Sequence, residues 1–213
     1  MVGVAALSLV VLAGCGQNDA KTTQIRPGSN AADATPVAQH ASTADHPQAS
    51  GATSSATSVA GISFTAPSHW QNLGPNGMRK AQFRLTAQEG DTAPGEVNVF
   101  YFGPTSGGGV QANLDRWIGQ MVMPDGSDPA AAAKSSTFSA NGMAGHIVSL
   151  NGSYKSGGGR PMGGNTTIMP GYRLVGVVLE GPQGSVFFKL TGPLATAQAM
   201  ESELLAMVEN AHH

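Results

Sequence analysis

Residues 172–190 read YRLVGVVLEGPQGSVFFKL, and this stretch decides the fold class of the chain. Residues 172–180 and 185–190 are predicted strands, and the Gly181-Pro182 pair between them is typical of the end of a regular element. The first strand is apolar at successive positions from Val175 to Leu179, so both of its faces must be covered. Since short connections favour antiparallel neighbours, the stretch predicts a central, mostly antiparallel sheet with a layer on each side.

Five further runs rich in β-branched and aromatic residues are also predicted strands. Asn141-Gly142 lies between two of these runs and predicts a tight hairpin turn. The five runs cover residues 62–65, 78–85, 96–102, 134–139 and 145–151.

Two segments have the apolar spacing of amphipathic helices. We expect both apolar stripes to belong to the core, with their methionines filling irregular gaps in the packing. Helices flanking the predicted sheet give an α+β fold, an α/β/α sandwich around a mostly antiparallel sheet. The first stripe is Val110, Leu114, Trp117, Ile118 and Met121, and the second is Ala197, Met200, Leu204, Met207 and Val208.

Three motifs resemble those of bacterial lipoproteins with a PsbP-like domain: MRKA at 78–81, NLDRW at 113–117, and YRL at 172–174 with FFKLTGP at 187–193. The PsbP-like fold is an α/β/α sandwich shared with extrinsic subunits of photosystem II and with a eukaryotic import factor that binds a Ran-type GTPase. The resemblance covers residues 62–208 and implies this fold. Because known members are largely non-enzymatic binding or assembly factors, it also implies such a function here, but no functional residue transfers.

The N-terminal segment has the features of an export signal. Residues 2–13 form an apolar run that is shorter than the roughly 20 residues of a membrane span but suits the core of a signal peptide. The run ends in Leu12-Ala13-Gly14-Cys15, which resembles the lipobox where bacterial lipoproteins are lipidated and cleaved. The resemblance implies a signal peptide over residues 1–14 and a membrane anchor through lipid on Cys15.

The alternative is an ordinary secretory signal whose cleavage region contains a cysteine. No Lys or Arg precedes the apolar run, so we expect the true start of the chain to lie upstream of Met1. Gly16, rather than Asp, follows Cys15, which resembles lipoproteins exported to the outer membrane of Gram-negative cells. The expected location is the cell envelope outside the cytoplasm, and in a Gram-negative cell the outer membrane facing the periplasm.

Residues 15–60 are a predicted tether and residues 61–213 a predicted single domain. The tether is rich in Ala, Ser, Thr and Pro, shows no periodicity, and as a flexible coil would have an r.m.s. reach of roughly 35 to 40 Å. Large apolar residues begin at Ile62 and continue to Val208, a length that supports one core.

Charge and cysteine content exclude several classes of function. The net charge is -2 and the 11 Lys and Arg residues are scattered, which argues against nucleic-acid binding. Cys15 is the only cysteine, so the chain can form neither an internal disulfide nor a thiolate metal cluster. The sequence has no nucleophile elbow and no phosphate-binding loop, and we expect no enzymatic activity, no cofactor and no metal site.

Residues 152–171 are predicted to form a long glycine-rich loop. Tyr, Arg and Met are enriched at protein interfaces, and glycine lets such side chains adapt to a partner. The hypothesis is that this loop contacts a protein partner in the envelope, and the alternative is a surface loop without that role. The candidate contact residues are Tyr154, Lys155, Arg160, Met162 and Met169.

A second hypothesis is a small-molecule or metal-handling envelope protein, or an enzyme whose site assembles only in the fold, such as His146 with a methionine. His146 is predicted to share one strand face with Ala144, Val148 and Leu150. This position favours a hydrogen-bonded histidine in the core over a ligand or a catalytic group.

Overall fold

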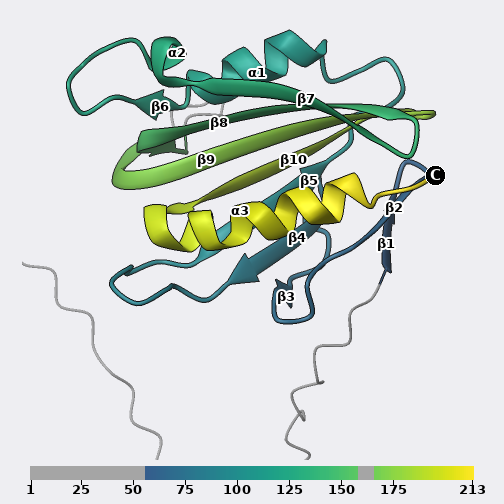
Figure 1. Ribbon diagram of the computed structural model, residues 1–213, viewed down its shortest axis with the longest axis horizontal. Coiled ribbons are helices and arrows are strands. Elements are labelled where there is room, and N and C mark those ends of the chain that lie inside the picture. Colours follow the sequence, from purple (N-terminus) through teal and green to yellow (C-terminus); the bar gives the residue numbers. More distant parts are fainter. Residues whose placement is uncertain (1–55, 158–165) are drawn as a thin grey trace, which may run out of the picture. The chain divides into compact units, whose positions relative to one another are not determined.

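A computed structural model describes residues 56–157 and 166–213, which form an α+β domain (Figure 1). Its large sheet is antiparallel in every pairing, with the strand order β3-β4-β5-β10-β9-β8-β6, and β7 pairs with β8. The elements are β1 Ala56–Val59, β2 Ile62–Thr65, β3 Gln71–Asn72, β4 Arg79–Leu85, β5 Gly95–Phe100, α1 Val110–Ile118, β6 Met121–Val122, α2 Pro129–Ala132, β7 Lys134–Ala140, β8 Met143–Ser156, β9 Thr167–Gly181, β10 Gly184–Pro193 and α3 Leu194–Glu209.

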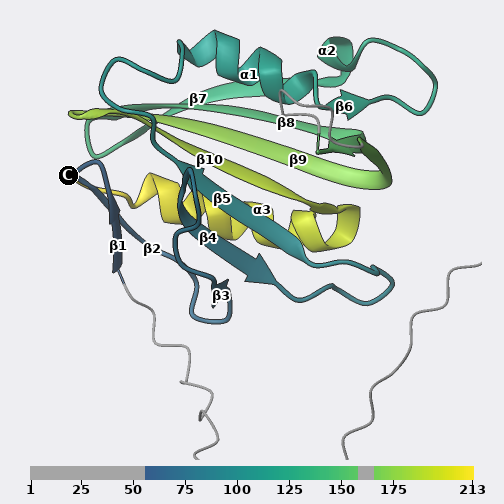
Figure 2. The same cartoon turned by 180° about the vertical axis from the view of Figure 1, so that it is seen from behind.

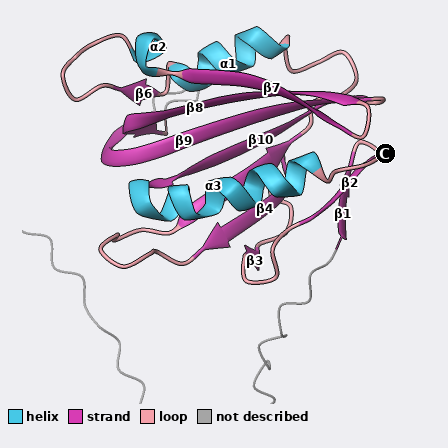
Figure 3. Ribbon diagram, viewed as in Figure 1, coloured by secondary structure: helices cyan, strands magenta, loops and turns pink. Residues whose placement is uncertain are grey.

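Helices cover both faces of the sheet, as Figure 3 shows. Helix α3 packs against β9, β10 and β5, whereas α1 packs against β8 and β9. The predicted α/β/α arrangement around an antiparallel sheet is therefore confirmed, and the β1–β2 hairpin adds a separate two-stranded sheet at one end.

Strand β9 supplies both cores, because successive side chains point to opposite faces of a sheet. Val175, Val177 and Leu179 pack in the cluster that includes α3, while Leu174 and Val178 pack in the cluster that includes α1. All five residues are fully buried. Two-sided burial is thus the physical reason for the continuous apolar run in this strand.

Tight turns join several of the strands. Asn141 and Gly142, at φ 50° and 85°, make the predicted turn between β7 and β8, a type I′ arrangement that suits the twist of a hairpin. Ala60 and Gly61, at φ 51° and 76°, join β1 to β2 in the same way. Strand β1 falls inside the predicted tether, so the ordered domain begins before residue 61.

The predicted loop over residues 152–171 is wrong at both ends, over residues 152–156 and 167–171. Strand β8 continues to Ser156 and β9 begins at Thr167, and the two strands pair in this region. Gly152 is required by close packing, since a Cβ there would lie 2.8 Å from the carbonyl oxygen of Val122 in β6. Glycine at this position therefore reflects the close approach of two strands, and not the loop flexibility predicted from the sequence.

The first helix is also shorter than its apolar stripe predicts. Helix α1 ends at Ile118, and Gly119 follows as its C-cap. Met121 instead begins β6 and pairs with Tyr154, although it is buried in the cluster with α1 as expected of a core residue. Met200 and Met207 lie on the buried face of α3 and belong to the core, which confirms their predicted packing role.

Candidate binding site

The sheet face that carries α1 is only partly covered by that helix, which contacts β8 and β9. On β5 and β10 the same face carries Phe100 and Phe187 in the α1 cluster, and beyond them, and on β4, it carries polar side chains. The alternate residues, such as Phe83, Val97 and Leu190, point into the α3 core. We call this set the polar face. It consists of Gln82, Arg84, Glu96, Asn98, Lys189 and Thr191.

A cavity of about 390 Å³ lies over the polar face, with lining residues from β4, β5, β8, β9, β10 and the loop before β5. This volume falls within the roughly 300 to 1,000 Å³ typical of small-molecule sites. The side chains that line it include those of Arg79, Glu96, Asn98, Tyr154, Met169 and Tyr172.

Lys189 does not itself line the cavity but bonds to the lining residue Tyr154, and the partners of its ammonium group are neutral. Its Nζ donates to the Tyr154 hydroxyl oxygen at 2.8 Å and to Gln120 Oε1 at 2.7 Å, and it lies 4.9 Å from the centre of the Tyr154 ring. Among the described residues, no ion pair includes Lys189. Burial, assisted by the charge of Arg79, lowers the pKa of Lys189 to about 8.

The end of the β8–β9 hairpin curls over the polar face. Across the sheet, Lys189 of β10 pairs with Gly176 of β9, which in turn pairs with Val148 of β8. The Lys189 side chain nevertheless bonds to Tyr154, which is six residues further along β8 than Val148. The register shift between Gly152 and Tyr154 marks where the hairpin bends. Strand β6 supports this end by pairing with β8, next to the end of α1 (Figure 2).

Two tyrosines form one wall of the cavity. The rings of Tyr154 and Tyr172 are nearly parallel, with an interplanar angle of 14° and 6.2 Å between their centres. Burial raises the pKa of both hydroxyls, so both are protonated at neutral pH. Because the Tyr154 oxygen accepts a bond from Lys189, the Tyr154 hydroxyl keeps its own proton to donate.

Charged groups of both signs complete the cavity. Arg79 is exposed at its edge, and its Nη1 donates to Gln82 Oε1 at 3.0 Å. Glu96 Oε1 accepts from Arg84 Nε at 3.2 Å and Nη2 at 2.7 Å, which largely compensates both charges. Arg79 and Lys189 have no carboxylate partner among the described residues, so these two cations are not compensated by an ion pair.

The structure brings only part of the predicted contact segment to this cavity. Tyr154 and Met169 line it, whereas Lys155, the next residue along β8, does not. Arg160 and Met162 lie outside the described residues. Sequence reasoning missed Arg79, Glu96, Asn98, Tyr172 and Lys189, and the one available signal was a lysine between apolar residues in FFKL.

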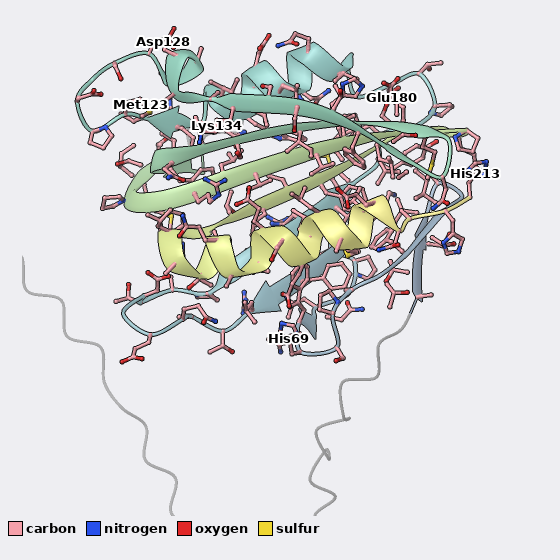
Figure 4. All side chains as sticks on the ribbon, viewed as in Figure 1. His69, Met123, Asp128, Lys134, Glu180 and His213 are labelled. Atoms are coloured by element: carbon pink, nitrogen blue, oxygen red, sulfur yellow. The ribbon has the colours of Figure 1, made fainter. Side chains whose placement is uncertain are left out.

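His146 lies on the predicted strand face but is not a core residue. Its Nε2 is 2.8 Å from Glu180 Oε1, and its side chain remains 27% exposed, because this end of the sheet extends past α1. His69 similarly pairs with Glu203 at 3.2 Å. Figure 4 shows His69 and Glu180 in separate parts of the domain.

The described ranges 56–157 and 166–213 lack a metal-binding cluster and a membrane-spanning helix. No three His, Cys, Asp or Glu residues there are grouped so that they could hold a metal ion. No helix in the same ranges is long and apolar enough to cross a membrane.

Comparisons with known proteins concern the fold alone. No protein-family model and no curated protein matches the chain. The solution structure of cyanobacterial PsbP from Synechocystis is similar, with a TM-score of 0.41 and 12% identity, covering 72% of this chain and 86% of that one. A crystal structure of a Pseudomonas aeruginosa protein of unknown function is also similar, with a TM-score of 0.38 and 15% identity, covering 73% and 93%.

The lowered pKa of Lys189 predicts a dependence of stability on pH. Its ordinary value is 10.5 and its folded value about 8, so between these pH values the unfolded chain binds more protons than the folded chain. The free energy of unfolding should therefore gain up to ~3 kcal/mol from this residue as pH rises through that window. Urea denaturation of the wild type and of Lys189→Met, compared at each pH, measures this gain.

Lys80→Met is the matched control, because Lys80 is an exposed lysine of β4. Its curve should run parallel to that of the wild type across the pH range, while the difference between the wild type and Lys189→Met changes. Equal slopes for the wild type and Lys189→Met would contradict the burial of this ammonium group.

Proposed function

We propose that this chain is a membrane-anchored extracytoplasmic lipoprotein whose domain is a non-enzymatic binding or assembly module for a protein partner in the envelope. The observation that carries the proposal is the convergence of Arg79, Tyr154, Met169 and Tyr172 on one cavity. These residues come from β4 and from the consecutive strands β8 and β9, and their types are those that interfaces favour.

Rigid placement supports a binding role for the cavity. Tyr154 and Met169 lie on paired strands, so a partner would meet side chains that are already ordered. The polar groups also support binding over catalysis, since each is engaged in a fixed contact: Arg79 with Gln82, Glu96 with Arg84, and Lys189 with Tyr154.

Anchoring is supported by the N-terminal sequence. The resemblance of Leu12-Ala13-Gly14-Cys15 to a lipobox supports lipid on Cys15, and the composition of residues 16–55 suits a tether. The binding face would then act within a few tens of ångströms of a membrane, as estimated from a flexible coil of this length.

A second candidate function is small-molecule handling, and the cavity volume of about 390 Å³ is the observation that favours it. In that case a free ligand, rather than a side chain of a protein partner, would occupy the same residues.

Partner capture in the native envelope tests the binding role. A photo-crosslinking residue at Thr167, which is exposed and pairs with the cavity residue Ser156, should capture one specific protein. Arg79→Ala and Met169→Ala should each reduce the yield of that adduct about tenfold or more, the loss expected when one anchor residue of an interface is truncated. Quantitative mass spectrometry of the adduct measures the loss.

Neighbouring residues that do not line the cavity provide matched controls. Lys80→Ala and Ile168→Ala remove exposed side chains beside Arg79 and Met169 and should keep the wild-type yield. If the cavity variants captured as much as these controls, the cavity would not be the contact.

Lipidation is tested at Cys15. Replacement of Cys15 by Ser should abolish incorporation of a labelled fatty acid and release the chain from the membrane fraction, because no other cysteine is present. Gly16→Ser, next to the lipid site, should leave labelling intact. Undiminished labelling of the Cys15→Ser chain would show that this residue does not carry the lipid.

A further inference from the structure

We propose that the cavity receives a carboxylate group of its ligand, held between the Lys189 ammonium and the Arg79 guanidinium beside the Tyr154 hydroxyl. This inference rests on the proposed binding function and names the chemistry of the ligand. The carboxylate would belong either to an acidic residue of the protein partner or to a free small acid.

The Lys189 ammonium has no anionic partner among the described residues. An ammonium group has three N–H donors, and two of those of Lys189 are used by the neutral acceptors Tyr154 and Gln120. Withdrawing a cation from water without an opposite charge is unfavourable, and proteins normally pair such groups. A carboxylate in the adjacent cavity would accept the third donor and supply the missing charge.

Arg79 provides a second cation at the same place. One of its five N–H donors bonds to Gln82, so others remain for a ligand at the edge of the cavity. The positive charge of Arg79 acts on Lys189, since it contributes to the lowered pKa of that residue. The two like charges repel each other, and an anion between them would relieve that repulsion.

The remaining charged groups favour a singly charged ligand over a dianion, since the carboxylates of Glu96 and Asp91 both act on Tyr172 of the cavity wall. Glu96 of β5 faces the cavity and acts on both Tyr154 of β8 and Tyr172 of β9, raising the pKa of each. Its carboxylate is paired with Arg84, but its field still opposes a dianion such as phosphate. A singly charged, planar carboxylate suits this set better, and it matches the fork geometry of Arg79.

The walls of the cavity indicate what the carboxylate is attached to. Tyr154 and Tyr172 present nearly parallel rings, and Met169 adds a flexible apolar side chain. Such surfaces accept aliphatic or aromatic groups. The expected ligand group is therefore a carboxylate on an apolar stem, as in a glutamate side chain or an aryl acid.

Titration of three probes into the full chain tests this assignment. The probes are N-acetylglutamic acid amide, benzoate and inorganic phosphate, and the signal is the ¹³C-methyl resonance of Met169 in labelled protein. A carboxylate probe should shift this resonance saturably, whereas phosphate should bind at least tenfold more weakly. Tighter binding of the glutamate probe would indicate an acidic residue of the partner as the source, and tighter binding of benzoate a free small acid.

Lys189→Met and Arg79→Met should each weaken binding of the carboxylate probe at least tenfold, and Lys80→Met should leave it unchanged. In the wild type, affinity should fall as pH rises through about 8, because Lys189 loses its proton. Arg79 is exposed, so its variant reports on the site even if Lys189→Met does not fold. Equal affinity for phosphate, or binding that neither variant weakens, would overturn the carboxylate site.

Failure of this inference can be told from failure of the proposed function. If partner capture depends on Met169 but is unchanged in Lys189→Met, and neither carboxylate probe binds, the cavity remains the binding site and the carboxylate assignment is wrong. If capture is also independent of Met169, the proposed function itself is contradicted.

Discussion

Strand β9 has to bury both of its faces, and the rest of the domain is arranged to satisfy that requirement. Each fully buried Val or Leu contributes roughly 1.5 to 3 kcal/mol, so an uncovered face of β9 would cost much of the stability of a small domain. Helix α3 covers one face and α1 the other. The contact of α1 is close, because a Cβ on Gly176 would collide with the ring of Trp117.

The limited coverage by α1 is what creates the candidate site. The helix has nine residues and contacts β8 and β9, so beyond Phe100 and Phe187 the same face of β4, β5 and β10 carries polar side chains. The β8–β9 hairpin then curls over this region and brings Tyr154 to Lys189. A sandwich with one incomplete layer thus produces a cavity whose floor is polar and whose wall is aromatic. In the part of the chain that the structure describes, two nearby cations, Arg79 and Lys189, have no carboxylate partner.

Sequence patterns predicted the parts of the fold that depend on local periodicity and turn chemistry. The apolar run in β9, the stripe in α3 and the Asn141-Gly142 turn all follow such rules. The length of the β8–β9 hairpin does not follow such rules. Gly152 is a glycine because β6 approaches closely, and this contact cannot be seen in the local sequence. The cavity depends on contacts between distant strands, so Tyr154 could be singled out by residue type while its partner Lys189 could not.

The pKa of the Lys189 amine is the measurement that tests this account most directly, since the candidate site depends on a desolvated cation without an opposite charge. The side-chain ¹⁵N and ¹³C resonances of Lys189 can be followed by NMR as pH is varied in the ligand-free full chain. The account predicts a midpoint at about 8. A midpoint near the ordinary value of 10.5 would show that the ammonium is hydrated or already paired, and would contradict the account.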